Sequence, residues 1–337
     1  MKSFVFQDRL NLDELRLVER PIPKPAARDV LLKMRAASLN FRDLLIARGR
    51  YGQYPLPRIP LSDGAGEVVA VGTQVRRFQV GDLVCPTYVP DWLEGSASET
   101  SAKRRLGGPV DGVLTEYMCV HEDEAVRAPR HYDAREAATL PVAGATAWQA
   151  LFTDGVLRPG DTVCVQGSGG VSLFCVQLAR MTGARVVSVS RGCGSRKERL
   201  EGLGALVVDA GATDWVELVK GASDGKGVDV FVNVVGGAGL THSIAATRVG
   251  GTVLLVGFVG GSEAPLDLLT TIRRSVLLRA VSGGSRHSFE ALVRALEANE
   301  TRPVIDRVFP FAEARRAYEH MESSRPFGKV VLEFNDK

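Results

Sequence analysis

The chain has 337 residues, 45% of them apolar and 24% charged, and its 42 basic and 39 acidic side chains leave a net charge of +3. This is the composition of a globular protein long enough for two domains, and no long run of one charge indicates nucleic acid or a membrane surface as a partner. The N-terminal stretch meets acidic residues too early for a secretory signal, and no segment approaches the ~20 apolar residues of a membrane span. We therefore expect a cytoplasmic protein.

The first 125 or so residues predict an all-β domain. Short β-type runs alternate with Pro and Gly clusters and helical periodicity is scarce, which is typical of a compact antiparallel barrel or sandwich. One helix is predicted at residues 40–48. Residues 90–112 are polar and patternless and predict a long surface loop, a kind of segment that often acts as a functional lid.

From about residue 134 helical and strand patterns alternate. After a helical stretch at 134–152, strands are predicted at 162–166, 185–189, 206–210, 228–235, 251–258 and 275–282. Helices between most of these strands predict an α/β unit with a doubly wound parallel six-stranded sheet of the dinucleotide-binding (Rossmann) kind. β-type patterns return after a helix at 288–299. We therefore expect a catalytic domain over residues 1–125, a dinucleotide-binding domain over 126–300 and a C-terminal return to the first domain over 301–337.

A glycine-rich turn joins the first strand of this unit to its first helix. The spacing is Gly-x-Gly-x-x-small, in which Gly167 permits the tight turn and Gly169 lets the backbone approach a pyrophosphate at the helix N-terminus. Ser172 stands where a third glycine is usual, and Gly170 adds slack. We predict that Gly167, Ser168, Gly169 and Gly170 bind a cofactor. A structural turn without a ligand is the alternative.

The end of the second strand predicts which dinucleotide binds. An acidic residue about 20 positions after the first glycine would hold the ribose 2′-hydroxyl of NAD. Ser190 and Arg191 fill that place, and Arg196 and Lys197 follow. With no carboxylate to repel a 2′-phosphate and several cations nearby, NADPH is favoured over NADH. For Lys197 a solvated helix start is an alternative.

Five motifs in order resemble the medium-chain dehydrogenase/reductase superfamily over the full length, and within it the zinc-free quinone oxidoreductase-like and alcohol dehydrogenase-like proteins. They are SLNFRDLLIARGRYG, IPLSDGAGEVVAVG with VGDLV, LPVAGATAWQAL, GSGGVS and PFGKVVLEF. The resemblance implies a GroES-like antiparallel β-barrel domain beside the dinucleotide-binding domain. It also implies a homodimer joined edge to edge through the last strand, here SVLLRAVS.

The resemblance also bears on zinc. Zinc-dependent members place a Cys, a His-Glu pair and a second Cys on the metal, and this sequence has Asn40, Ser62-Asp63 and Val142 there. The four-cysteine structural lobe of those members would fall in residues 86–112, which contain no cysteine. We therefore predict no bound metal of either kind.

Without a metal, hydrogen-bond donors must hold the oxygen that gains charge during hydride transfer. Tyr51 matches the tyrosine that zinc-free quinone and enoyl reductases carry after the same helix, and Asn40 stands at the vacated ligand position. We predict that both are catalytic, while Asp43 and Asp63 hold the fold and the site entrance. The alternatives are that Tyr54 is the functional tyrosine and that Asn40 only caps its helix.

The resemblance assigns further cofactor contacts. Thr146 would lie beside the nicotinamide carboxamide and Val171 behind its ring, while Lys329 would reach the pyrophosphate from the first domain. Asn233 and the Val256, Gly257 and Phe258 turn end strands four and five, where such a cofactor crosses the sheet edge.

These features predict an NADPH-dependent oxidoreductase that transfers hydride to a small, apolar quinone or α,β-unsaturated carbonyl compound. One alternative is a zinc-independent alcohol dehydrogenase or carbonyl reductase, which would ask more of Tyr51 and Asn40. An alternative of another class is an NADPH-binding sensor or structural protein without turnover. Substrate choice is expected to depend on residues 90–112 and on Tyr88, Trp92 and Phe258.

Overall fold

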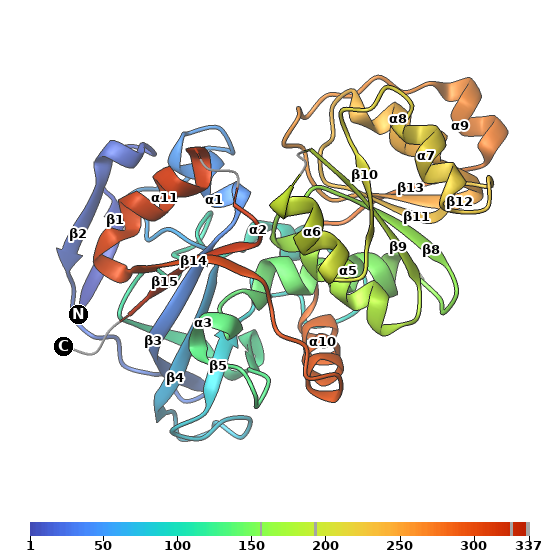
Figure 1. Ribbon diagram of the computed structural model, residues 1–337. Coiled ribbons are helices and arrows are strands. Elements are labelled where there is room, and N and C mark those ends of the chain that lie inside the picture. Colours follow the sequence, from blue (N-terminus) through green and yellow to red (C-terminus); the bar gives the residue numbers. More distant parts are fainter. Residues whose placement is uncertain (156, 192–193, 324–325, 335–337) are drawn as a thin grey trace. The chain divides into compact units, whose positions relative to one another are not determined.

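The computed structural model describes residues 1–155, 157–191, 194–323 and 326–334. The chain forms two compact units (Figure 1). Unit 1 comprises Met1–Ala145 and Gly283–Lys337, and unit 2 comprises Thr146–Ser282. The sequence analysis places the domain boundaries near residues 125 and 300. In the structure, unit 1 extends further at both boundaries, to Ala145 and from Gly283.

Unit 2 contains a six-stranded parallel sheet in the order β10-β9-β8-β11-β12-β13, which confirms the doubly wound prediction. The strand order reverses beside β8, as it does in dinucleotide-binding sheets. Cys164, Phe231 and Val253 are fully buried in its core, because a parallel sheet is covered on both faces. The strands are β8 (Thr162–Gln166), β9 (Arg185–Ser190), β10 (Leu206–Asp209), β11 (Val228–Asn233), β12 (Thr247–Leu255) and β13 (Leu277–Ala280).

In the described part of the chain, the helices between these strands are α5 (Gly170–Met181), α6 (Ser195–Gly202), α7 (Trp215–Gly221), α8 (Gly239–Ala246) and α9 (Leu268–Arg274). Helix α9 was not predicted: Leu268, Leu269 and Ile272 recur at helical spacing, but the run is short and none of its residues is buried. The signal that was available is Asp267, whose carboxylate accepts from the backbone N–H of Thr270 at the helix start.

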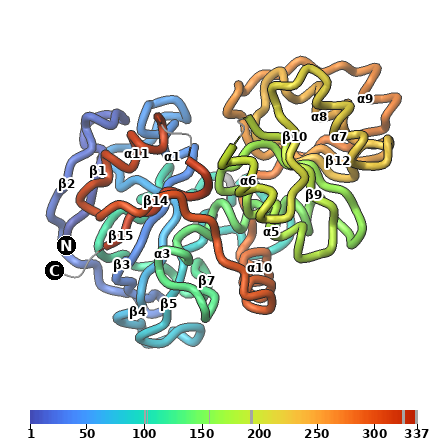
Figure 2. Tube along the Cα trace, viewed as in Figure 1, coloured from blue at the N-terminus to red at the C-terminus, as the bar shows by residue number. Residues whose placement is uncertain are grey.

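Unit 1 is built on a seven-stranded sheet in the order β14-β15-β3-β4-β5-β7, with β6 also paired to β3, and on a separate β1-β2 hairpin. Its strands are β1 (Lys2–Phe6), β2 (Leu15–Glu19), β3 (Asp29–Leu39), β4 (Asp63–Val71), β5 (Leu83–Pro86), β6 (Tyr117–His121), β7 (Ala125–Arg127), β14 (Ile305–Pro310) and β15 (Lys329–Glu333). The C-terminal segment is part of this unit, and Figure 2 shows its strand β15 beside β3. The sheet is mixed rather than wholly antiparallel, because helix α11 (Ala314–Ser323) lets β14 and β15 run parallel.

The remaining helices are short, and none of the helices in the described part of the chain is both long and apolar enough to cross a membrane. They are η1 (Leu12–Glu14), α1 (Phe41–Ala47), α2 (Glu99–Lys103), η2 (Glu122–Glu124), α3 (Ala134–Ala137), η3 (Leu140–Gly144), α4 (Ala145–Trp148), η4 (Gln149–Asp154) and η5 (Phe311–Glu313). Helix α1 agrees with the predicted helix. Helix α2 lies in the segment predicted to be patternless and is capped by Ser98.

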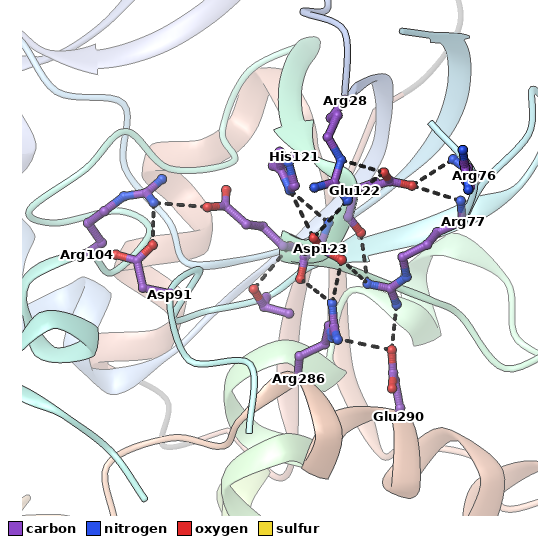
Figure 3. Close-up of polar contacts among 12 residues, drawn as sticks. Arg28, Arg76, Arg77, Asp91, Arg104, His121, Glu122, Asp123, Arg286 and Glu290 are labelled. Carbon is purple, nitrogen blue, oxygen red and sulfur yellow. Dashed lines mark hydrogen bonds and ion pairs between the residues drawn. The ribbon is translucent and has the colours of Figure 1, made fainter. Parts of the chain in front are cut away.

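Helix α10 (Arg286–Ala298) belongs to unit 1, and an ion-pair network centred on Asp123 joins it to other segments of that unit (Figure 3). The Asp123 carboxylate pairs with Arg286 at 2.8 Å and with Arg77 at 3.5 Å. Arg77 also pairs with Glu290 of the same helix at 2.5 Å. The sequence analysis placed this helix at the end of the dinucleotide-binding domain, and no local pattern reveals these charge partners.

Candidate active site

Asp63, the first residue of β4, is the centre of a buried polar cluster in unit 1. Its Oδ2 accepts hydrogen bonds from Asn40 Nδ2 at 2.8 Å and from Lys329 Nζ at 3.0 Å, with the Ser38 hydroxyl 3.2 Å away. Its Oδ1 accepts the backbone N–H of Val142 at 2.7 Å. The sheet register creates this cluster, because β4 pairs with β3 at Ser38 and β3 pairs with β15 beside Lys329. Both carboxylate oxygens of a fully buried side chain are thereby satisfied.

The resemblance noted above implies that zinc-dependent members of the superfamily hold their catalytic metal at the positions of this cluster. Of the residues there, Ser62 and Val142 offer no ionised ligand, and the Asp63 oxygens are already engaged. The ammonium of Lys329, 3.0 Å from that carboxylate, would repel a second cation. The described residues contain no group of three or more His, Cys, Asp or Glu that could hold a metal. The side chains present do not fit a zinc ion.

Arg42, on helix α1, forms a second buried cluster. Its guanidinium donates to Ser62 Oγ, to the carbonyl of Leu106 at 3.0 Å and to the carbonyl of Gly108 at 2.9 Å. Asp43 lies 3.3 Å from it and accepts the Ser62 hydroxyl at 2.7 Å. Arg42 thus ties helix α1 to the segment that follows α2. Our sequence analysis missed this residue, although an arginine within an apolar helix was a visible signal.

Two tyrosine rings face the Arg42 guanidinium. Its central carbon lies 5.4 Å from the ring centre of Tyr51 and 4.9 Å from that of Tyr88, both within cation–π range. Burial raises the pKa of Tyr88 to about 12, against the opposing charge of Arg42. Burial also raises the pKa of Asp43, although Arg42 and the Ser62 hydroxyl lower it. Tyr88 is therefore a buried neutral phenol, whereas the half-buried Tyr51 keeps part of its surface accessible.

The neighbouring Tyr54 has different surroundings. Its ring packs against Gly108, where an added Cβ would come within 2.9 Å of it. Burial raises the pKa of its phenol, and Arg42 and Arg105 lower it less. Of the two candidate tyrosines, Tyr51 is the one whose ring stacks on Arg42. Trp92, expected to influence substrate choice, is buried against Tyr88 and donates its indole N–H to the Gly95 carbonyl at 2.9 Å.

In unit 2 the predicted glycine turn has the geometry of an anion cradle. Gly167 adopts a φ of +73°, a conformation that favours glycine. Gly169, the N-cap of α5, is exposed, and an added Cβ there would meet nothing within 4 Å. The Ser172 hydroxyl donates to the carbonyl of Gln166 at 2.7 Å and fastens the helix to its strand. The buried Oε1 of Gln166 has no partner within the described chain. Open backbone at a helix N-terminus and an unsatisfied polar atom beside it fit a nicotinamide dinucleotide.

The basic residues that were predicted to bind the 2′-phosphate have different surroundings in the structure. Arg196 donates to the Ser168 hydroxyl, which brings its guanidinium to the glycine turn. Ser190 is buried at the end of β9, and Arg191 after it is exposed. Lys197 points along α6 and pairs with Glu201 at 3.7 Å, the solvated alternative that its sequence position allowed.

The strand-end residues are placed as follows. Asn233 is fully buried and donates to Ser243 Oγ at 2.9 Å, while its Oδ1 accepts the backbone N–H of Gly236 at 2.7 Å. It therefore shapes the turn after β11. Phe258 in the neighbouring turn is 38% exposed. The other predicted cofactor contacts of unit 2 are the buried Thr146, the half-buried Val171 at the start of α5, and Val256 with Gly257 after β12.

Lys329 differs from its prediction. Its ammonium is buried and donates to the Leu39 carbonyl at 2.7 Å, to Asn40 Oδ1 at 2.6 Å and to Asp63. All three of its hydrogens are used inside unit 1, so none is left for a pyrophosphate. The antiparallel pairing of β15 with β3, which no sequence pattern near Lys329 reveals, is the reason.

Comparison with known proteins identifies the family. A family described as "Alcohol dehydrogenase GroES-like domain" matches residues 26–130, and one described as "Zinc-binding dehydrogenase" matches residues 203–332. The chain is 35% identical to a zinc-type alcohol dehydrogenase-like protein of Schizosaccharomyces pombe, over 98% of this chain and 99% of that one. It is 28% identical to the acryloyl-coenzyme A reductase of Metallosphaera sedula, over 98% and 99%.

A solved structure from Sinorhizobium meliloti 1021, described as a candidate alcohol dehydrogenase, superposes with a TM-score of 0.93 at 39% identity. It covers 99% of this chain and 98% of its own. Sequence and fold thus agree over nearly the whole length. The chain belongs to the medium-chain dehydrogenase/reductase superfamily of nicotinamide-dinucleotide-dependent oxidoreductases.

Proposed function

We propose that this oxidoreductase uses NADPH, without zinc, to transfer hydride to a quinone or an α,β-unsaturated carbonyl compound. The observation that carries the proposal is the Asp63 cluster. At the positions of the family's metal ligands it has a carboxylate already neutralised by Lys329, and a half-buried amide, Asn40. Hydrogen-bond donors, and not a Lewis acid, then polarise the carbonyl group of the substrate.

The preference for NADPH rests on charge. Arg196 reaches the glycine turn through Ser168, and Arg191 is exposed at the end of β9. A 2′-phosphate carries extra negative charge, which guanidinium groups bind through short, charge-assisted hydrogen bonds. A hydrogen bond of this kind contributes about 1.5–3 kcal/mol, enough to favour NADPH over NADH by roughly tenfold or more.

The groups of unit 1 suit a conjugated acceptor. The bound nicotinamide supplies hydride to the β-carbon, and negative charge appears on the carbonyl oxygen of the substrate. Tyr51 O–H and Asn40 N–H are the donors that we assign to that oxygen. A proton from Tyr51 or water completes the saturated product. Because the enolate is delocalised, two neutral donors are enough to stabilise it.

Reduction of a simple carbonyl is the second candidate, favoured by the 35% identity to an alcohol dehydrogenase-like protein. It requires the same donors to support a localised alkoxide. The two reactions give different products from one substrate, because 2-hexenal yields hexanal by C=C reduction and 2-hexenol by C=O reduction.

The test is to incubate chelator-treated protein with NADPH and 2-hexenal and to identify the product by mass spectrometry. We expect hexanal, formed at the same rate before and after chelation, and slower turnover with NADH. Hexenol would establish carbonyl reduction. Loss of activity on chelation with recovery on adding zinc would overturn the metal-free proposal. Tight NADPH binding without any product from enals, quinones or aldehydes would favour a sensor or structural role.

We further propose a homodimer formed through unit 2. Strand β13 is the last strand of its sheet, so one of its edges has no partner strand among the described residues. Leu277 on this strand is 53% exposed, and Leu268, Leu269 and Ile272 of α9 are still more exposed. An apolar edge strand of this kind is a template for pairing with a second copy. Light scattering should report a dimer for the wild type and a monomer for Leu277→Asp, and a wild-type monomer would refute the proposal.

A further inference from the structure

The side-chain amide of Asn40 lies between a group that can only donate hydrogen bonds and a group that can only accept them. Its Oδ1 is 2.6 Å from the ammonium of Lys329, which can only donate. Its Nδ2 is 2.8 Å from the carboxylate of Asp63, which can only accept. Turning the amide over would place N–H against an ammonium and C=O against a carboxylate. Both contacts would then be repulsive, so the ion pair admits one orientation.

We propose that the buried Asp63–Lys329 pair is a positioning device, which fixes the Asn40 amide so that its second N–H is held ready for the substrate oxygen. This rests on the proposed function. Of the three side chains, Asp63 and Lys329 are almost fully buried and only Asn40 is partly exposed. One Nδ2 hydrogen is taken by Asp63 and one remains. Lys329 and Asp63 act through Asn40 and do not themselves touch the substrate.

The pair is well suited to this role because the ammonium of Lys329 and both carboxylate oxygens of Asp63 have hydrogen-bond partners. Lys329 has three acceptors, and the Asp63 oxygens also receive the Val142 N–H. A buried ion pair with unmet partners would be costly, whereas a fully hydrogen-bonded one holds its geometry. The backbone contacts to Leu39 and Val142 anchor both charges to the main chain. The orientation of Asn40 is therefore set by the fold and not by the substrate.

The pair also limits the substrate class. Its charges cancel, so the substrate meets a neutral amide donor where zinc-dependent relatives offer a dication. A neutral donor gives less stabilisation to a localised alkoxide than a metal does. The positioned Asn40 therefore suits acceptors whose product anion is delocalised, namely enals, enones and quinones.

The test compares steady-state kinetics of the wild type with those of Asp63→Asn/Lys329→Met, in which both charges are removed and the amide is free to turn. We expect kcat with 2-hexenal to fall roughly 10- to 100-fold, as for other small losses of catalytic alignment, with the KM for NADPH unchanged. Lys329→Arg keeps a cationic donor and should retain more of the kcat. If the KM for NADPH rises instead, with kcat unchanged, Lys329 serves the pyrophosphate and the inference is overturned.

Asn40→Leu keeps the ion pair and so does not depend on the folding of the double variant. It should lose about 100-fold in kcat, the cost of removing one donor to a developing oxyanion. In the Asn40→Leu background, removing the pair should cause no further loss of kcat. A kcat for Asn40→Leu equal to that of the wild type would overturn the inference. A wild type without enal or quinone turnover would instead refute the proposed function, so the two failures are distinguishable.

Discussion

The sharpest prediction concerns Gly169, the N-cap of α5. Its φ of −77° and ψ of 179° are open to any residue, and a Cβ there would meet nothing within 4 Å. Gly169→Ala should therefore leave the free protein unstrained. The added methyl group restricts the unfolded chain, which stabilises the folded protein by about 0.4–1 kcal/mol. Alanine is a poorer N-cap than glycine, at a cost of about 0.5–1 kcal/mol. The two effects nearly cancel, and we expect the melting temperature to change by less than about 3 °C.

Cofactor binding should respond quite differently to the same methyl group. If the pyrophosphate lies against the Gly169 backbone, the methyl occupies that space, and overpacking of this size costs about 1–3 kcal/mol. The Kd for NADPH should then rise roughly 5- to 150-fold. Calorimetric titration measures the affinity, and a thermal melt without cofactor measures the stability.

Gly221→Ala is the matched control, since Gly221 is also exposed, helix-terminal and free of contacts within 4 Å of an added Cβ. It should raise stability by up to about 1 kcal/mol and leave NADPH affinity unchanged. An unchanged affinity for Gly169→Ala would refute the assignment of this turn to the pyrophosphate. A large loss of stability would instead refute the claim that a methyl group at position 169 meets no other atom of the protein.

Three further predictions concern charged groups. Arg196→Ala should weaken NADPH binding about 10- to 100-fold and NADH binding little, as fluorescence titration with each cofactor would show; equal losses would contradict a 2′-phosphate role. Arg42→Met should lower the free energy of unfolding by about 3–5 kcal/mol in urea, because it leaves Asp43 buried without its cation. Burial alone would raise the pKa of Glu122, but hydrogen bonds from Arg76, Arg77 and Arg28 lower it below 4.5, so its stabilising contribution should be present at neutral pH and lost as the pH falls. Glu122→Gln should accordingly be less stable than wild type at pH 7, with a smaller difference at pH 3; a difference that does not shrink would refute this.

Unit 2 could be predicted from sequence because its central strands β8, β9 and β11 are buried apolar runs bounded by turns, and the crossover helices imply parallel pairing. Helix α9 was missed because it is seven residues long, so its apolar residues span too few turns to show a periodic pattern. The boundary beyond Ser282 was also missed, since α10 has the same amphipathic pattern whichever unit it packs on. Its unit is decided by contacts with distant segments, among them the Asp123 network and the hydrogen bond from the backbone N–H of Arg286 to the Trp92 carbonyl.

The chemistry of the site was less predictable than its residues. Asn40, Asp63 and Lys329 were each noted, yet Lys329 and Asp63 are 266 positions apart and meet only because β15 and β4 flank the same strand. The alternation of side chains along a strand predicts which face of the sheet a residue lies on. It does not predict which other strand pairs with that strand. The sequence alone therefore did not reveal that Lys329 contacts Asp63.

The two donors that we assign to the substrate share a physical arrangement. Asn40 is held by the ammonium of Lys329, and the Tyr51 ring stacks on the guanidinium of Arg42. Each cation has its own carboxylate, Asp63 or Asp43, at 3.0 Å and 3.3 Å. A single buried cation would pull an anionic ligand toward itself, but two neutralised pairs exert little net attraction at a distance. Their effect is local, because they orient a neutral N–H and a neutral O–H. Because each of these two pairs is neutral, we expect selectivity for acceptors that delocalise charge.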